Sequence, residues 1–408
     1  MNAPARDYRR FGDVSAEWPS LVAFLNGTWP SGVNSIRLPQ DNHLDLYIRG
    51  SINAARKQRT TLPVFFTGAV STRDGNPGPF FSGLRLGTEI ADAFVSIADP
   101  TMSDNAYLRL AWYTGRAGAA LQATIAAVLN AVARRTTQEL LMIGGSGGGF
   151  AALDAATRLR HPASVLVWNP QTNLLDYSPG PVLDYLKAVL PRTPSDILRM
   201  TRSERSAALT CGGITHEITL PTRRLNSRLR RIVYLQNSGD THVRDHAMPF
   251  FARAGFEDLG DGLYGDQADC TALVADMSPG HKPPSPDTIR YVAQALINTR
   301  TTGRRVLRNI ERDLHEESSA QTPAAPQRRH TLTVAGPGIL RAGTSDAGAR
   351  SYAFHIYRDD ARIHETGWLR ESSYEFAVTP GRYLVRVYAL SPSGTRSAHN
   401  TNSLVVPG

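Results

Sequence analysis

Between residues 44 and 300, short apolar runs alternate with stretches of helical periodicity. Most runs are apolar over four to six residues, which is typical of strands buried on both faces of a sheet. Strands that alternate with helices form a mostly parallel sheet with helices on both faces, so the predicted fold class is α/β. The predicted strands are 44–49, 62–67, 93–98, 107–112, 139–143, 164–168, 231–235 and 271–276, and the predicted helices are 117–135, 149–159 and 286–299.

Four regions of different composition predict the domain organisation. Residues 1–43 are expected to form an N-terminal segment that packs on the core of an α/β domain over 44–317. Residues 318–330 are small, polar and proline-containing, as in a linker. Residues 331–408 hold short alternating β runs separated by Gly, Pro, Asp and Ser, which predicts a small all-β sandwich. This run of strands resembles a fibronectin type III or immunoglobulin-like module.

The spacing of the predicted strands breaks once. About 60 residues separate 164–168 from 231–235, more than one crossover helix needs, which predicts a lid-like insertion at about 170–230. Residues 192–231 contain nine arginines and three acidic residues, in a chain of net charge +9. Such a region attracts anions. Because no aromatic interleaving or nucleic-acid module accompanies it, we expect no nucleic-acid partner.

Composition excludes several classes of protein. A content of 41% hydrophobic and 20% charged residues excludes a wholly disordered chain. No apolar run approaches about 18 residues, and the N-terminus lacks the apolar region of a secretory signal. We therefore expect a cytoplasmic protein without a membrane span. The two cysteines, Cys211 and Cys270, cannot form a disulfide scaffold and fit a reducing compartment, although one bridge between them stays open.

The strongest chemical signal is the sequence GGSGGG at 144–149, which joins a predicted buried strand directly to a predicted helix. It matches the G-x-S-x-G nucleophile elbow, in which the turn is too tight for side chains beside the serine. Ser146 would then expose its hydroxyl at the carboxyl edge of the sheet. The backbone N–H of Gly147 would lie at a helix N-terminus, where it can bind an oxyanion.

Other glycine-rich loops fit this sequence less well. A phosphate-binding P-loop would end in Lys-Ser/Thr, and a dinucleotide loop would need an acid about 20 residues on at a strand end. The sequence has neither feature. A purely structural turn remains an alternative, so the question is whether an acid and a histidine follow at suitable places.

Both residues follow at strand ends. Asp240 comes after the penultimate predicted strand, and His281 lies in the glycine-flanked loop after the last one. The order serine, acid, histidine is that of α/β-hydrolases, and all three positions fall at the same edge of the sheet. Asp245 and Asp276 are rival acids near the same strand ends.

With these motifs, residues 44–300 resemble the α/β-hydrolase superfamily. The GGSGGG elbow, the QNSGD turn at 236–240 and the GHKPP loop at 280–284 are similar to the serine acyltransferase and esterase-like proteins of bacterial surface-glycan systems. Those proteins include the accessory Sec glycan O-acetyltransferases. The resemblance covers about two thirds of the chain and leaves the C-terminal module as an appendage.

The resemblance also implies roles for individual residues. Ser146 would be the nucleophile, His281 the general base and Asp240 the residue that orients the imidazolium. The second oxyanion donor would be the backbone N–H of Gly68 or Ala69, in the loop after an early strand. This chemistry needs no cofactor, and we expect no metal.

Other residues near the acid turn or in the insertion have less specific roles. His242 and His246 alternate with acidic residues, so a metal site formed with Asp240 and Asp245 is an alternative if the segment is helical. The arginines of residues 192–231 either form a solvent-exposed surface or, if they border the pocket, favour an anionic substrate. The candidate substrate-binding residues are His242, Tyr177, Arg223 and Arg224.

The predicted function is acyl-ester hydrolysis or O-acyl transfer through an acyl-enzyme intermediate, on an acylated glycan or a related cell-surface ester. The main alternative is a non-catalytic accessory protein of surface assembly or secretion that uses the fold as a scaffold. The complete set of serine, acid and histidine argues against it. A peptidase on the same fold is a third possibility, and the C-terminal module would bind a protein or glycan partner.

Overall fold

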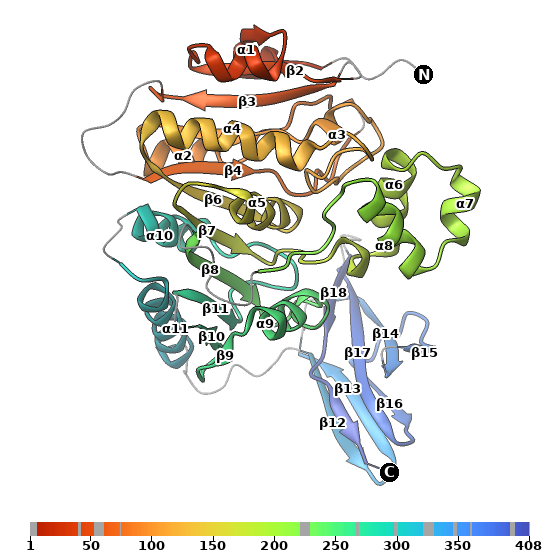
Figure 1. The fold of residues 1–408 in the computed structure, drawn as a ribbon. Helices are drawn as coiled ribbons and strands as arrows, with labels where there is room; N and C mark the ends of the chain where they lie inside the picture. Colours follow the sequence, from red (N-terminus) through yellow and green to blue (C-terminus); the bar gives the residue numbers. More distant parts are fainter. Residues whose placement is uncertain are drawn as a thin grey trace. The chain divides into compact units, whose positions relative to one another are not determined.

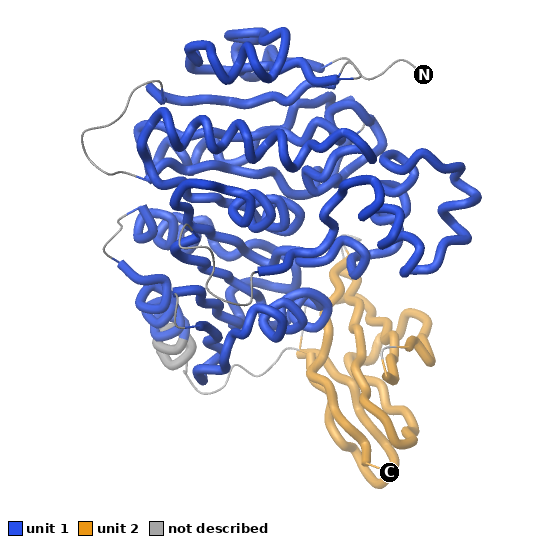
Figure 2. Tube along the Cα trace, viewed as in Figure 1, with its two compact units in different colours: residues 1–316 blue, residues 317–408 orange. Residues whose placement is uncertain are grey.

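The structure, a computed structural model, divides the chain into two compact units, residues 1–316 and 317–408 (Figure 2). Within the described residues, no helix combines the length and the apolar character needed to cross a bilayer. Cys211 and Cys270 are both free thiols. The described residues are 6–39, 42–52, 61–73, 75–220, 229–266, 269–297, 301–320, 330–345, 349–359, 361–391 and 396–407.

One sheet organises the first unit (Figure 1). Its described strands follow the order β1 (Val14–Trp18), β2 (Gly32–Arg37), β3 (His43–Arg49), β5 (Phe94–Ile97), β4 (Thr61–Phe66), β6 (Glu139–Gly145), β7 (Ala163–Trp168), β8 (Leu229–Asn237), β11 (Cys270–Ala275), β10 (Leu263–Gly265) and β9 (Glu257–Asp258). Neighbouring strands from β5 through β11 are parallel to one another. The predicted mostly parallel sheet is confirmed.

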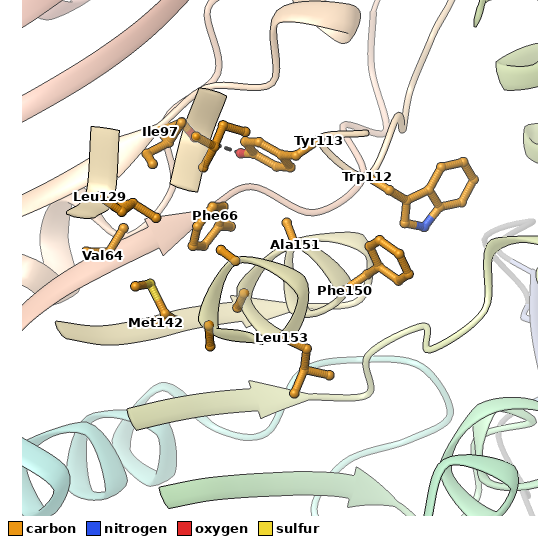
Figure 3. Close-up of a cluster of buried hydrophobic side chains, with 14 of the residues drawn as sticks. Val64, Phe66, Ile97, Trp112, Tyr113, Leu129, Met142, Phe150, Ala151 and Leu153 are labelled. Atoms are coloured by element: carbon orange, nitrogen blue, oxygen red, sulfur yellow. Dashed lines mark hydrogen bonds between the residues drawn. The ribbon is translucent and has the colours of Figure 1, made fainter. Parts of the chain in front are cut away.

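Helices cover both faces of this sheet because alternate residues of a strand point to opposite sides. The helices are α1 (Leu21–Asn26), α2 (Leu84–Ile90), α3 (Pro100–Ser103), α4 (Leu121–Thr136), α5 (Gly147–Arg158), α6 (Pro179–Val189), α7 (Pro194–Arg199), α8 (Arg202–Cys211), α9 (Met248–Ala254), α10 (Pro286–Ile297) and α11 (Gly303–Ala320). Met142 of β6 packs in the core with α4 and α5, whereas its neighbour Ile143 packs with α10 and α11. Figure 3 shows Phe150 and Leu153 of α5 in the first of these cores.

The N-terminal segment contributes strands of its own. β2 pairs antiparallel with β3, and β1 pairs parallel with β2, so the segment extends the edge of the sheet. Arg6 secures it through ion pairs with Asp104 at 2.6 Å and with the buried Asp45 at 3.4 Å. These strands were not predicted because their apolar patterns are short and interrupted by polar residues.

The predicted strand over 107–112 is wrong. The segment forms turns, and Trp112 and Tyr113 have φ angles of 54° and 59°, which a strand cannot accommodate. Its apolar residues are buried for another reason, since Leu110 and Trp112 pack against Gly147 at the turn after β6. An apolar pattern reports burial and not the direction of the backbone.

The second unit holds two antiparallel sheets whose buried residues, among them Leu332, Phe354 and Val387, form one core. The smaller sheet has the order β12 (His330–Gly336), β13 (Ile339–Thr344) and β16 (Ser373–Ala377). The larger has the order β15 (Ala361–Glu365), β14 (Ser351–Arg358), β17 (Gly381–Leu390) and β18 (Arg396–Asn400), and β19 (Leu404–Val406) pairs with β17.

Candidate active site

The GGSGGG sequence forms a sharp turn between β6 and α5. Ser146 stands between the two elements with φ 53° and ψ −122°, a conformation that L-residues rarely adopt. A Cβ atom on Gly144 would overlap the backbone oxygen of Gly148, and one on Gly148 would overlap that of Phe66. Only glycine therefore fits beside this serine, which is the geometry of a nucleophile elbow.

Three residues from the ends of three strands meet beside this turn. Ser146 Oγ lies 2.9 Å from His281 Nε2, and His281 Nδ1 lies 2.6 Å from Asp240 Oδ2. Ser146 follows β6, Asp240 follows β8 and His281 follows β11, so the parallel strands deliver all three to one edge of the sheet. In this arrangement the imidazole can accept the serine proton while the carboxylate holds its other nitrogen.

Asp240 is buried, and its carboxylate accepts hydrogen bonds from two histidines. Its Oδ1 accepts hydrogen bonds from the backbone N–H of His242 at 3.0 Å and from the Nδ1 of the same residue at 2.9 Å. Burial alone would raise the pKa of this carboxyl, but the hydrogen bonds from His242 and His281 outweigh burial and hold the pKa well below its usual range. Of the rival acids, Asp245 forms an ion pair with a neighbouring arginine, and Asp276 is exposed.

The backbone at Gly147 and the loop at Gly68 and Ala69 lie beside the serine. Gly147 is the first residue of α5, and the first N–H groups of an α-helix have no partner within the helix. Gly68 follows β4, and a Cβ atom there would lie 3.8 Å from the Cβ of Ser146. Ala69 lines the same cavity as Ser146. These positions suit the two donors of an oxyanion hole.

A cavity of about 730 Å³ opens at Ser146 and His281. Its wall includes the ends of β4, β6 and β7, one side of α2, the loop that leads into α10 and the start of α10 itself. The described part of the insertion, 170–220, contributes none of the lining residues, so the lid interpretation stays a prediction. The apolar lining residues include Phe65, Phe66, Leu86, Ile143, Trp168, Met277 and Ile289.

Two predicted substrate-binding residues lie away from the cavity wall. His242 is buried, and its ring stacks on that of His281 with 4.1 Å between centroids. Tyr177 is half-buried and packs edge-on against His242. Neither side chain lines the cavity, so both support the acid turn instead of bordering the space at the serine. Arg223 and Arg224 lie outside the described residues.

One neighbour of the reactive hydroxyl was not predicted. Gln171 is fully buried, and its Nε2 lies 2.9 Å from Ser146 Oγ and 2.9 Å from His242 Nε2. Trp112 Nε1 donates to Gln171 Oε1 at 3.1 Å, which fixes the orientation of the amide. Gln171 stands in an irregular segment and belongs to no motif. Its only signal in the sequence is its place three residues after the end of β7.

The described residues include one group that could hold a metal ion. Asp240, His242 and His281 each offer a ligand atom, and these atoms lie within 4.8 Å of one another. In the structure, however, both Nδ1 atoms are hydrogen-bonded to the carboxylate at 2.6 and 2.9 Å. His246 does not join this group, because its Nδ1 receives the backbone N–H of Thr172. The contacts are therefore those of two histidine N–H groups that donate hydrogen bonds to one carboxylate.

His246 should make the stability of the protein depend on pH. Its side chain is buried beside the ring of His242, and burial, with a smaller contribution from His242, lowers its pKa to about 3. An unfolded histidine has a pKa of about 6.5, so below that pH the unfolded state gains a proton that the folded state does not. The free energy of unfolding must therefore fall as the pH falls from about 6.5 towards the folded-state pKa.

The substitution His246→Asn isolates this contribution. Asparagine does not titrate and keeps an acceptor for the N–H of Thr172. Between about pH 7 and about pH 4, we expect the wild type to lose about 3 kcal/mol more unfolding free energy than the variant. Urea unfolding at both pH values measures the difference. Equal losses in the two proteins would contradict a neutral, buried His246.

Comparisons with known proteins show distant similarity only. No protein-family model and no curated protein matches the sequence. The capsule O-acetyltransferase of Neisseria meningitidis serogroup A aligns with 67% of this chain and 97% of its own, at 14% identity and a TM-score of 0.41. TT1662 from Thermus thermophilus aligns with 65% of this chain and 97% of its own, at 14% identity and a TM-score of 0.35.

A separate match involves a small part of the chain. The FN5 domain of Drosophila Lar aligns with 19% of this chain and 91% of its own, at 13% identity and a TM-score of 0.17. Identities and scores at this level carry no argument about activity. The function of this chain must therefore be argued from its own site.

Proposed function

We propose that the chain is a serine-dependent acyl-ester hydrolase or O-acyltransferase. One observation carries this proposal: an unbroken hydrogen-bonded path leads from Ser146 Oγ through His281 to Asp240, at a strained turn that borders a cavity. A serine hydroxyl is a weak nucleophile until a base of this kind activates it. A protein that used the fold only as a scaffold would need neither the strained turn nor the path.

The path supports a two-step reaction. Ser146 Oγ attacks the ester carbonyl carbon while its proton moves to His281 Nε2, and Asp240 stabilises the imidazolium. The carbonyl oxygen becomes an oxyanion beside the N–H groups of Gly147 and of Gly68 or Ala69, each of which contributes about 3 kcal/mol. The bond to the alcohol oxygen then breaks, and the alcohol leaves with the proton from His281.

The acyl group now forms an ester with Ser146 Oγ. A second nucleophile, water or a sugar hydroxyl, gives its proton to His281 Nε2 and attacks the acyl carbon. When this intermediate collapses, the bond to Ser146 Oγ breaks and the proton returns to that oxygen. Water yields hydrolysis and a sugar hydroxyl yields transfer, so one site serves both reactions.

We further propose an acylated glycan, or a related cell-surface ester, as the substrate. The support comes from the GGSGGG, QNSGD and GHKPP motifs, which resemble those of enzymes acting on surface glycans. The GGSGGG motif contains Ser146, the QNSGD motif contains Asp240 and the GHKPP motif contains His281. The motifs that support the substrate are therefore also those that form the path.

Trapping the acyl-enzyme tests this proposal. Wild-type protein mixed with p-nitrophenyl acetate is expected to release a burst of p-nitrophenol equal to the enzyme present. Rapid acid quenching and peptide mapping should then find one acetyl group, on Ser146. Added sugar alcohols would become acetylated if the enzyme transfers acyl groups. A folded protein that hydrolyses neither this ester nor p-nitrophenyl esters of longer acyl groups, and that forms no acyl-enzyme with any of them, would overturn the proposal.

A further inference from the structure

The size of the cavity bears on the length of the acyl group that the enzyme accepts. An acetyl group extends only one methyl beyond the carbonyl carbon, whereas the cavity measures about 730 Å³, the size of sites that hold whole small ligands. We propose that this cavity binds the acyl chain and that the enzyme prefers medium-chain acyl esters to acetyl esters. This inference rests on the proposed function and specifies the substrate class of the same site.

The wall of the cavity suits a hydrocarbon chain. Phe65 and Ile143, at the ends of β4 and β6, belong to the core on the side of α10, and Ile289 of α10 lines the cavity with them. Leu86 of α2 lies on the same wall. The charges of α2 are paired, since Arg85 lies 3.5 Å from Glu89. A chain attached at Ser146 can therefore exchange water for apolar side chains along its length.

The size of the preference follows from the burial of methylene groups. Each methylene that leaves water for an apolar wall should raise kcat/KM by about fourfold, until the chain reaches the end of the cavity. The increase belongs to the acyl side of the ester. Lengthening the alcohol at a fixed acyl group should have no such effect, because the proposal places the acyl chain and not the alcohol against this wall.

A series of p-nitrophenyl esters with acetyl, butanoyl, hexanoyl and octanoyl groups tests this inference. We expect kcat/KM to rise about fourfold per methylene over the first members. Leu86→Trp places a larger side chain in the cavity, and it should lower the ratio of kcat/KM for the octanoyl ester to that for the acetyl ester at least tenfold. Leu84→Trp is the matched control, because Leu84 is also half-buried on α2 but does not line the cavity, and it should leave the ratio unchanged.

The possible failures are distinguishable. If acetyl is the best substrate, or if Leu86→Trp slows all esters equally, the cavity does not hold the acyl chain, while the serine chemistry stands. If the folded protein hydrolyses no ester of the series and forms no acyl-enzyme, the proposed function itself fails.

A different observation identifies a further catalytic residue. Five groups form a closed ring of hydrogen bonds: Ser146 Oγ, His281, Asp240, His242 and Gln171. We infer that the amide of Gln171 donates a hydrogen bond to the nucleophilic oxygen throughout the reaction.

One assignment of protons satisfies the whole ring. Trp112 Nε1 can only donate, so the Gln171 atom that it contacts is the oxygen, and the nitrogen faces Ser146 and His242. The two hydrogens of that nitrogen then go to Ser146 Oγ and to His242 Nε2. His242 consequently carries its proton on Nδ1, where it donates to Asp240. Because Ser146 Oγ accepts from Gln171, the hydroxyl hydrogen of Ser146 is directed at His281 Nε2, as nucleophilic attack requires.

This contact should matter most when the serine oxygen carries charge. A hydrogen bond to a charged acceptor is stronger than one to a neutral hydroxyl, so Gln171 stabilises the oxygen as its proton leaves. Gln171 does not line the cavity, so its loss should lower kcat and leave KM nearly unchanged.

The substitution Gln171→Glu tests this role because glutamate keeps the shape and the acceptor for Trp112 but loses both donors. We expect kcat, and the rate of labelling by a fluorophosphonate, to fall about 10- to 100-fold with little change in KM. Gln122→Glu is the matched control, since Gln122 is also buried and its amide bonds the backbone of Thr215 and the side chain of Asp154, neither of which belongs to the ring around Ser146. A folded Gln171→Glu with normal kcat, or an equal loss in Gln122→Glu, would overturn the inference.

Discussion

Replacing His281 with alanine is expected to lower ester hydrolysis by about 10⁴- to 10⁶-fold while the protein stays folded. His281 Nε2 is 2.9 Å from Ser146 Oγ and is the group placed to take the serine proton. The side chain is about one-third exposed, so its removal leaves little cavity in the core. Initial rates with a p-nitrophenyl ester measure the effect, and circular dichroism checks the fold.

The chain supplies a matched control for this substitution. His216 Nε2 lies 2.9 Å from Ser206 Oγ, the same separation as in the site, but this pair does not border the cavity. His216→Ala should therefore leave the rate within about twofold of the wild type. A similar loss in both variants, or full activity in His281→Ala, would show that the path through His281 is not the source of the activity.

Replacing Asp240 with asparagine should cost about 10⁴-fold in kcat. The carboxylate accepts Nδ1 hydrogen bonds from both His281 and His242, and asparagine can accept from only one of them without a clash of donors. One imidazole must then change its tautomer or its orientation. If it is His281, the proton sits on Nε2 and the ring can no longer act as the base.

Asp245→Asn separates this effect from a general loss of acidic charge. Asp245 is five residues further along the chain and forms an ion pair with Arg244, so its substitution should leave kcat within about twofold. Stopped-flow measurement of the burst would report the acylation rate of each variant. A large loss in Asp245→Asn with normal rates in Asp240→Asn would assign the acid to the rival position.

The site could be located from the sequence wherever the relevant signal is local. The turn around Ser146 is encoded by five glycines next to a buried strand, and each strand end then limits where an acid or a histidine can stand. Asp240 and His281 both follow such strand ends. The sequence favoured Asp240 and left Asp245 as a rival, and in the structure it is the carboxylate of Asp240 that contacts His281 and His242.

Features that depend on long-range packing could not be predicted. The segment over 107–112 has a strand-like apolar pattern, yet it turns twice because Leu110 and Trp112 pack over the serine turn. Gln171 contacts Ser146 only because the chain after β7 bends back over that turn, and no local pattern encodes the bend. The cavity wall joins α2 to α10, which are about 200 residues apart in the sequence.

Intact mass after incubation with a fluorophosphonate tests the central claim most directly. The wild type should gain one adduct, and peptide mapping should place it on Ser146 and not on Ser206, a second serine that lies 2.9 Å from a histidine. Ser146→Ala should gain none. An adduct that persists in Ser146→Ala, or a folded wild type that stays unmodified, would contradict an activated serine at this site.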